Sequence, residues 1–259
     1  MKQRSAHIPT LWSLRPAGEH AALRLLLQAK GLRVRALPSV RLVGCAPGAV
    51  LEQALAARVR VFTSPAAVRF ASRLAALSQP GHHLNIAVGE GTALALKAAG
   101  VEGPLAPSRM DSEGVLDLPA LAQVQGQRVG LFTAPGGRGL LSAVLAERGA
   151  TVLRADVYER LALPLKTRAL SALAADASAI LMASSAEALA HFQNALDRLP
   201  PAQQGAVRAR PLVVSSARLA HWAEQQGFQH VEVADSPRPE SLCDAAVKAT
   251  SGRSMLARS

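Results

Sequence analysis

The sequence predicts an α/β protein of two similar lobes, each a parallel sheet flanked by helices, joined by a two-stranded connector with a cleft between the lobes. Short apolar runs alternate with amphipathic segments along the 259 residues, which is typical of parallel sheets covered by helices on both faces. Small residues, often Gly or Ser, follow many of the apolar runs. The whole pattern then recurs at a period of roughly 120 residues.

Strands are expected where short runs rich in Val, Leu, Ile or Phe are bounded by turn residues. In chain order these runs are 11–14, 32–37, 58–62, 84–88, 127–132, 151–153, 179–183, 211–214 and 229–233.

Helices are expected between these strands, where apolar residues recur at helical spacing and start or stop signals flank them. Ser64 is a predicted N-cap with Pro65 at the first helical position. Four glycines are predicted to end helices, namely Gly31, Gly100, Gly149 and Gly227. The expected helices are 19–30, 48–57, 65–76, 89–99, 117–124, 140–148, 186–196, 217–226 and 239–249. Residues 103–114 and the segment near Pro200-Pro201 read as loops, and the tail from Ser251 as frayed.

The repeat organises the chain into two lobes. A turn, a helix, a glycine, a strand and a crossing segment occur around residues 15–42 and again around 134–161. The simplest arrangement places 1–38 with 161–259 in one discontinuous lobe and 43–155 in an inserted one. Segments 39–42 and 156–160 then form the connector, and two connectors at one edge make a hinge and a cleft.

Six turns are expected at the carboxyl ends of the strands, where parallel α/β sheets bind ligands. They are Arg15–Gly18, Thr63-Ser64, Gly89–Thr92, Pro135–Arg138, Ser184-Ser185 and Ser215–Arg218. Each opens a helix, and helix N-termini present free N–H groups that bind anions. Such turns would suit a ligand with several carboxylates or phosphates.

Simpler interpretations stay open for these residues. Ser64, Ser184 and Ser215 could be ordinary N-caps, and Ser184 with Glu187 has capping-box spacing. The arginines of the turns could be plain surface charges. The pair His82-His83 reads as a solvated turn without a third metal ligand, and the cysteines, Cys45 and Cys243, read as buried thiols. A dinucleotide fingerprint is disfavoured, because Leu94 stands where Gly or Ala is needed, and no phosphate-binding P-loop is present.

Tyr158 is the strongest candidate for a reacting group. It is the only tyrosine of the chain, and it lies in the connector segment Asp156–Arg160, where a pure packing role is less expected. A phenol has an ordinary pKa of about 10, so it keeps its proton at neutral pH and can donate it. A tyrosine that only packs at the hinge is the alternative.

Seven segments, in this order and spacing, resemble the uroporphyrinogen-III synthase family between about residue 11 and residue 248. They are Leu14-Arg15-Pro16, Phe62–Val68, Val88-Gly89 with Thr92-Ala93, Pro135–Arg138, Val157–Arg160, Ala183–Glu187 and Ser215–Ala220. Each motif is weak alone, and together they are fairly specific. Leu14 and Ala183 depart from the pattern, because members often have Thr at both positions.

The resemblance implies two α/β lobes with the active site between them. It implies cyclisation of the linear tetrapyrrole hydroxymethylbilane to uroporphyrinogen III, with loss of water, inversion of ring D through a spiro intermediate, and no metal or cofactor. Tyr158 is then the acid that helps the hydroxyl leave. The implied substrate-binding residues are Arg15, Thr63, Ser64, Gly89, Thr92, Gly137, Arg138, Ser184, Ser185, Ser215 and Arg218.

Composition agrees with an anionic small-molecule substrate. The formal net charge is +11, and the tetrapyrrole carries eight carboxylates. A nucleic-acid binder is disfavoured, because aromatic residues make up only 3% of the chain and no nucleic-acid motif occurs. A two-lobe small-anion-binding protein without catalysis is the other alternative. No membrane-length apolar run and no secretory signal occur, so a soluble, cytoplasmic protein is expected. A monomer is expected as well.

Overall fold

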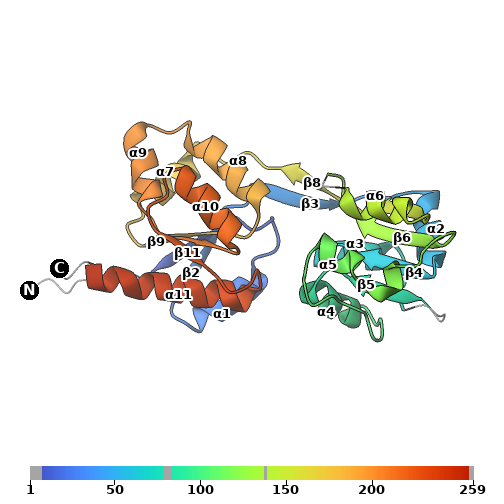
Figure 1. The fold of residues 1–259 in the computed structure, drawn as a ribbon. Helices are drawn as coiled ribbons and strands as arrows, with labels where there is room; N and C mark the ends of the chain where they lie inside the picture. Colours follow the sequence, from blue (N-terminus) through green and yellow to red (C-terminus); the bar gives the residue numbers. More distant parts are fainter. Residues whose placement is uncertain (1–7, 79–82, 137–138, 257–259) are drawn as a thin grey trace, which may run out of the picture. The chain divides into compact units, whose positions relative to one another are not determined.

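The computed structural model describes residues 8–78, 83–136 and 139–256, with side chains described as far as Thr250. The chain divides into two compact units. Unit 1 comprises Met1–Arg41 and Leu161–Ser259, and unit 2 comprises Leu42–Arg160. Both are parallel α/β structures, as the sequence predicts (Figure 1).

Unit 1 contains a five-stranded parallel sheet in the order β11-β10-β9-β1-β2. Its strands are β1 Thr10–Ser13, β2 Arg33–Ala36, β9 Ala179–Ala183, β10 Leu212–Val214 and β11 Val231–Val233. The three central strands are buried throughout, because helices cover both faces. Their continuous apolar sequences, without alternation, reflect that double coverage.

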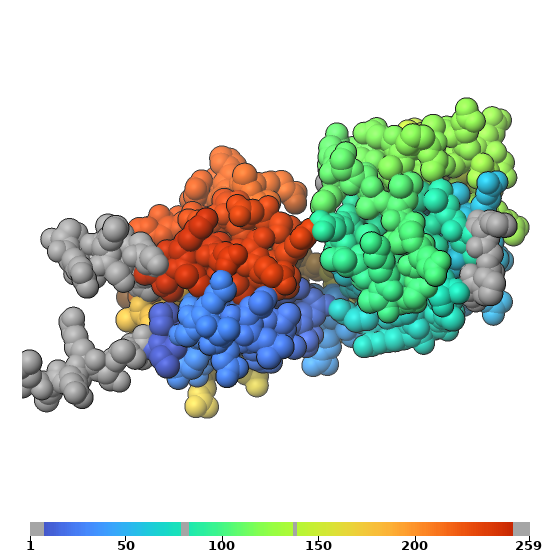
Figure 2. Space-filling view, turned by 90° about the horizontal axis from the view of Figure 1, so that it is seen from below, coloured from blue at the N-terminus to red at the C-terminus, as the bar shows by residue number. Residues whose placement is uncertain are grey.

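Helices α1 (Ala21–Gln28) and α11 (Pro239–Leu256) cover one face of this sheet. Figures 1 and 2 both show them side by side, α1 in blue and α11 in red. On the opposite face the core is closed by α7 Thr167–Ala175, α8 Ala186–Leu196, α9 Pro201–Arg208 and α10 Ala217–Gln225. Each face therefore has a separate apolar layer.

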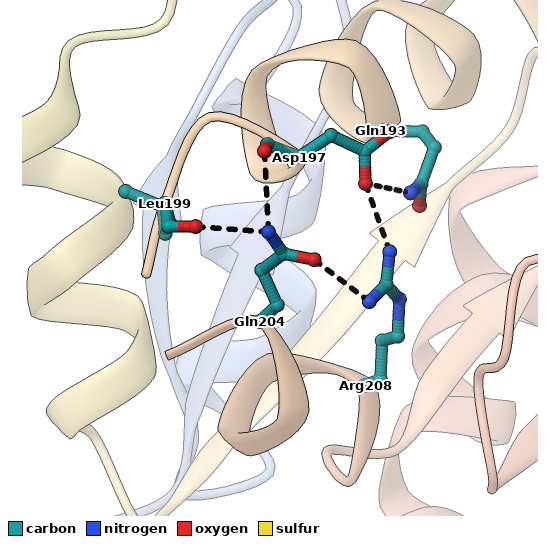
Figure 3. Close-up of polar contacts among 5 residues, drawn as sticks. All are labelled: Gln193, Asp197, Leu199, Gln204 and Arg208. Carbon is teal, nitrogen blue, oxygen red and sulfur yellow. Dashed lines mark hydrogen bonds and ion pairs between the residues drawn. The ribbon is translucent and has the colours of Figure 1, made fainter. Parts of the chain in front are cut away.

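A polar network ties α8 to α9 (Figure 3). The Asp197 carboxylate accepts hydrogen bonds from Gln193 Nε2 at 2.7 Å and Arg208 Nη2 at 2.9 Å. The Gln204 amide donates to the carbonyls of Asp197 at 3.1 Å and Leu199 at 2.8 Å, and its oxygen accepts from Arg208 Nη1 at 3.0 Å. The carbonyls of the turn that follows α8 thus gain partners, and the turn is held against α9.

Unit 2 contains a four-stranded parallel sheet in the order β5-β4-β6-β7. Its strands are β4 Val59–Phe62, β5 Leu84–Ala87, β6 Arg128–Thr133 and β7 Thr151–Asp156. A parallel bridge between Ile86 and Leu105 extends the sheet beyond β5.

Helices cover both faces of this sheet as well. One face packs against α2 Ala49–Ala56, α3 Pro65–Leu74 and α4 Glu90–Ala98. The other packs against α5 Ser112–Leu116, the 3₁₀ turn η1 Pro119–Leu121 and α6 Leu140–Glu147. Phe62 and Phe132 stack at 4.5 Å between ring centroids on neighbouring strands, and they anchor the first of these layers.

Strands β3 (Val40–Gly44) and β8 (Tyr158–Ala162) form the two-stranded connector. The amide of Leu163 donates to the carbonyl of Ser39 at 2.8 Å, and that of Cys45 donates to Val157 at 3.0 Å. Residue numbers rise on one strand as they fall on the other, so the connector is antiparallel.

The internal repeat is confirmed by topology. Read along each sheet, β10-β9-β1-β2 of unit 1 matches β5-β4-β6-β7 of unit 2, and β11 matches the bridge at Leu105. In both units the chain therefore reverses its direction of winding at one place, between β9 and β1 and between β4 and β6. Topological switch points of this kind are where open α/β sheets bind ligands.

Several sequence-based expectations need correction. Neither α7 nor α9 was predicted, and α9 occupies the segment read as a loop near Pro200-Pro201. The helix predicted at 117–124 is only the 3₁₀ turn, whereas α5 begins inside the predicted loop 103–114 and ends at Leu116. Helix α11 continues to Leu256 instead of fraying from Ser251.

Other local predictions had mixed outcomes. All four helix-ending glycines have positive φ, between 72° and 85°, as predicted: Gly31, Gly100, Gly149 and Gly227. Cys243 is buried, but Cys45 is only half-buried. His83 is half-buried, and its Nδ1 lies 3.0 Å from the carbonyl oxygen of Ala57, so it is not a freely solvated side chain. His82 lies outside the described residues.

Candidate active site

The predicted site residues of each unit gather at the carboxyl ends of its strands. In unit 1, register places Ser13 beside Met182, and Ala183 beside Val214. In unit 2, Phe62 lies beside both Ala87 and Phe132. The loops that leave these strand ends, and the helices that follow, hold every predicted binding residue that the structure describes.

Thr63 and Ser64 occupy the switch point of unit 2. The Thr63 hydroxyl is 3.0 Å from Thr133 Oγ1 and 3.3 Å from the carbonyl oxygen of Phe132, so it bridges the ends of β4 and β6. Ser64 is the N-cap of α3, and its Oγ accepts a 3.0 Å hydrogen bond from the amide of Ala67. The predicted cap and its Pro65 are confirmed.

The Tyr158 hydroxyl lies next to the Ser64 hydroxyl. The two hydroxyl oxygens are 3.1 Å apart, and Arg160 Nη2 donates to the phenol oxygen at 3.1 Å. The ring stacks on Phe70 at 5.4 Å between centroids, and the Arg160 guanidinium lies 5.4 Å from the ring centroid. Tyr158 is only 2% exposed, whereas Ser64 is half-buried. The buried phenol is therefore connected by a hydrogen bond to the half-buried hydroxyl of Ser64, which follows the carboxyl end of β4.

Gly89 and Thr92 lie at the end of β5. Gly89 is the N-cap of α4 in extended backbone, and a Cβ there would lie 3.3 Å from Met110 Cβ. The amide of Thr92 donates to the carbonyl of Gly89 at 3.0 Å, and Thr92 is only 4% exposed. Burial leaves the Thr92 hydroxyl little access to a ligand, while Met110 above Gly89 is 58% exposed.

In unit 1, Arg15 follows β1. Its side chain is 19% exposed and forms a 3.7 Å ion pair with Glu19, and its amide donates to Ser13 Oγ at 3.3 Å. Its buried Nε has no hydrogen-bond partner among the residues that the structure describes. The neighbouring His20 is 2% exposed, and burial lowers the pKa of this imidazole below its ordinary value.

The predicted serines of unit 1 are placed differently from expectation. Ser185, not Ser184, caps α8 by accepting from the amide of Ala188 at 3.1 Å. Ser216, not Ser215, caps α10 by accepting from Leu219. The Ser215 hydroxyl instead donates to the carbonyl of Ser184 at 3.2 Å, joining the ends of β9 and β10. The capping-box prediction for Ser184 is therefore wrong by one position.

Arg218 lies in the first turn of α10 and is exposed. Gly137 and Arg138 fall outside the described residues, so their predicted roles stay predictions. Arg160 and Thr133 were not among the predicted site residues. Arg160 could have been found from its place in the Val157–Arg160 motif, and Thr133 from its place at the end of a strand.

Neither a metal-binding cluster nor a membrane-spanning helix occurs among the described residues. No three His, Cys, Asp or Glu side chains come together as a possible metal site. Of the helices that the structure describes, none combines the length and apolar character needed to cross a bilayer.

Comparison with known proteins places this geometry in context. Residues 21–244 match the model of the family described as uroporphyrinogen-III synthase HemD. The uroporphyrinogen-III synthase of Salmonella typhimurium is 33% identical over 174 residues, which span 61% of this chain and 65% of that protein. The Escherichia coli protein of the same name is 32% identical over 162 residues, with the same coverages. The chain thus aligns with just under two thirds of each relative's length.

Solved structures agree at the level of the fold. A mutant uroporphyrinogen III synthase from Thermus thermophilus superposes with a TM-score of 0.62 at 20% identity, covering 94% of this chain and 99% of that one. The Helicobacter pylori synthetase superposes with a TM-score of 0.60 at 15% identity, covering 93% and 99%. The family match covers most of the chain and both units, and this protein belongs to the uroporphyrinogen-III synthase HemD family.

Proposed function

We propose that this protein is a hydro-lyase of tetrapyrrole and heme biosynthesis that cyclises hydroxymethylbilane to uroporphyrinogen III. The observation that carries the proposal is the hydrogen-bonded group Ser64–Tyr158–Arg160 at the switch point of unit 2, in a chain of this family. It supplies an acid, a route to the surface and a cation beside the acid. Such a group suits a reaction whose first need is the departure of a hydroxyl group.

Substrate carboxylates would be held at the helix N-termini. Ser64 and Gly89 begin α3 and α4 in unit 2, and Ser185 and Ser216 begin α8 and α10 in unit 1. Free amides and the positive end of each helix dipole favour anions at such places. Arg15 and Arg218 would add charge, and Arg138 is proposed for the same role. An octacarboxylate could use many such weak contacts at once, which orients the chain for ring closure.

The proposed chemistry begins with the C–O bond of the hydroxymethyl group. As this bond breaks, the departing hydroxyl takes a proton and leaves as water. Ser64, the more exposed hydroxyl, donates that proton and receives the proton of Tyr158 in return. Arg160 already donates to the phenol oxygen and stabilises the negative charge that forms there. A proton lost later from the tetrapyrrole restores the phenol.

The remaining task is positional. The same substrate can close without an enzyme to give the symmetric isomer, so the protein must favour attack at the substituted carbon of ring D. Holding the carboxylates in a fixed arrangement stabilises that transition state over the alternative. This part of the proposal needs orientation by side chains and helix ends, without a further reacting group.

A coupled assay tests the proposal. Purified protein is mixed with freshly generated hydroxymethylbilane, the products are oxidised, and the uroporphyrin isomers are separated by chromatography. Isomer III in excess over isomer I is expected. Isomer I alone, formed at the rate of the protein-free blank, would refute the synthase activity and favour the two-lobe anion-binding protein. Mass measurement in the same preparation tests the predicted monomer, and cell fractionation tests the predicted cytoplasmic location.

A further inference from the structure

The outer edge of the unit 1 sheet has backbone groups that no described strand pairs with. Strand β2 ends the sheet order and pairs only with β1 among the strands that the structure describes. The amides of Arg33 and Leu37 donate to the carbonyls of Pro9 and Ser13, at 3.0 and 2.8 Å. Because strand residues alternate in direction, the N–H and C=O groups of Val34 and Ala36 point away from β1, toward the free edge.

A groove of about 830 Å³ runs along this edge. Arg24 and Gln28 of α1 line one side, Ala175 of α7 lines the other, and Arg33 to Arg35 of β2 form the floor. Helix α1 packs on one face of the sheet and α7 on the opposite face. The groove therefore lies around the edge itself, where an added strand would direct alternate side chains toward the two helices.

The charge of the groove is positive. Arg24, Arg33 and Arg35 are all exposed, and none of them forms an ion pair with a carboxylate of the described residues. The nearby carboxylate of Asp176 is already engaged. It accepts from Trp12 Nε1 at 3.0 Å and from the amide and hydroxyl of Ser178 at 3.0 and 2.6 Å.

We propose that this groove binds an extended acidic segment of a partner protein, which pairs with β2 as a sixth strand. Backbone hydrogen bonds to Val34 and Ala36 would fix the segment in place. Its acidic side chains would reach Arg33 and Arg35 on the α7 side and Arg24 on the α1 side. Strand addition of this kind takes affinity from the main chain and specificity from alternate side chains.

Charged residues on an edge strand also serve another purpose, because they prevent edge-to-edge association of identical molecules. The position of Arg24 favours a binding role for the groove. It lies on α1, not on the edge strand, and yet it lines the same groove. A guard against self-pairing requires charge on the strand only, whereas a site for an acidic strand requires charge on both sides.

The probe is a fluorescein-labelled ten-residue peptide in which Glu-Glu and Thr-Thr pairs alternate, so that Glu lies on both faces of the added strand. Binding is followed by fluorescence anisotropy. Saturable binding is expected, with no binding of a peptide carrying Lys in place of Glu. A peptide with Pro in place of Thr keeps the charge but lacks two N–H groups on each edge of the strand, and it should bind at least about tenfold more weakly. Equal binding of the Pro peptide would refute strand addition.

Protein variants test the groove itself. Ala36→Pro removes an N–H that faces the free edge and leaves the pairing with β1 intact, since Pro is tolerated on edge strands. The single changes Arg24→Ser and Arg35→Ser each remove one groove charge. Ala36→Pro should weaken binding of the acidic peptide by up to about tenfold, and each Arg→Ser change by about two- to fivefold. Arg128→Ser, which changes an exposed arginine of β6 in unit 2, should not weaken it.

Folding and self-association are measured on every variant by thermal melting and light scattering. Weakened peptide binding in a variant that melts like the parent supports the proposal. If Arg35→Ser instead dimerises and still binds the peptide with parental affinity, the arginines only guard the edge and the proposal is wrong. Equal weakening by Arg128→Ser would also overturn it, because the peptide would then sense net charge only.

Discussion

At the scale of single residues, Tyr158 is the most informative position. Its hydroxyl is bonded to Ser64 and Arg160, and its ring stacks on Phe70. Tyr158→Phe removes the acidic proton and retains the stack. We expect kcat to fall by about 10²–10⁴-fold, because that is the usual cost of losing a general acid. The measurement is initial rate of isomer III formation, with thermal melting as the control. Nearly full kcat would mean that Tyr158 only packs.

Ser64 can be tested separately as the proton relay. Ser64→Thr keeps both the hydroxyl and the cap of α3, so it should keep most of the activity. Ser64→Asn keeps the cap, because Asn is as good an N-cap as Ser, but it has no hydroxyl to pass a proton. We expect kcat to fall by at least about tenfold in the Ser64→Asn variant while the melting temperature stays near that of the parent. Similar rates for the two variants would argue against a relay.

Arg160 is a positioning residue in this scheme, and its test needs more than a rate. Arg160→Lys keeps the cation but loses the planar fork, whereas Arg160→Gln loses the charge. If Arg160 stabilises the charge forming on the phenol oxygen, Gln should lower kcat more than it raises KM, and Lys should restore part of the loss. Equal effects on kcat from both variants, with KM unchanged, would indicate a purely structural role.

His20 is expected to make the free energy of unfolding depend on pH. Burial lowers its pKa in the folded chain, so below about pH 6.5 the unfolded chain binds a proton that the folded chain does not. Its contribution to stability is therefore complete above that pH and is lost as the pH falls. We expect the unfolding free energy of His20→Gln to decrease less than that of the parent between about pH 7.5 and about pH 5. Urea titrations measure this, and parallel curves would contradict it.

The sequence predicted the kinds of residue in the site better than their contacts. Ser64 could be recognised as a cap because a proline follows it and the amide it bonds is three residues away. Its second bond, to Tyr158, joins positions 94 residues apart, and no local pattern reports such a contact. The pairing of Thr63 with Thr133, 70 residues apart, escaped prediction for the same reason.

At the scale of elements, the position of a cap can be decided by mutation. In α8 the first helical residue is Ala186, and Ser185 bonds the amide of Ala188. We expect Ser185→Ala to lower the unfolding free energy by about 1 kcal/mol, the usual loss for an N-cap. Ser184→Ala is the matched control and should cost less, because the cap of α8 is the hydroxyl of Ser185. Chemical denaturation of both variants compares them directly, and the reverse order would restore the original assignment.

The accuracy of the predicted elements follows from the strength of their local signals. Strands of continuous apolar sequence and helices ended by glycine were found, since both signals lie within a few residues. Helix α9 was missed because it begins at Pro201, the second residue of a proline pair that is typical of a loop. Its place depends on the network of Asp197, Gln204 and Arg208, which is a tertiary feature (Figure 3). Helix α7 carries Leu170, Leu173 and Ala174 at helical spacing, so its local sequence does indicate a helix.

At the scale of the whole molecule, the repeat in the sequence corresponds to a repeat in sheet topology. Equivalent strands of the two units hold equivalent places in their sheets, including the switch points that carry Ser64 and Ser185. The turns that follow strands can be recognised in a sequence. Because a parallel sheet has all its carboxyl ends along one edge, these turns can be expected to lie together. The predicted cleft, by contrast, depends on the angle at the connector, and no residue pattern encodes an angle.

The division into two units also makes a prediction about folding. Unit 2 is one continuous segment, Leu42–Arg160, and both of its apolar layers are drawn from within it. We therefore expect the isolated segment to fold, with one cooperative thermal transition. Both tryptophans of the chain, Trp12 and Trp222, lie in unit 1, so Tyr158 dominates the near-ultraviolet signal of the segment.

That signal makes the test specific to the site. A folded segment should give a near-ultraviolet circular dichroism band from an immobilised Tyr158, and the band should disappear at the thermal transition. Phe132→Asp is the matched negative control, since a charge in the stack with Phe62 should abolish both band and transition. A segment that is helical but lacks the band would show that the Ser64–Tyr158–Arg160 group needs unit 1 to form. The proposed acid, Tyr158, would then be held in place only in the complete chain.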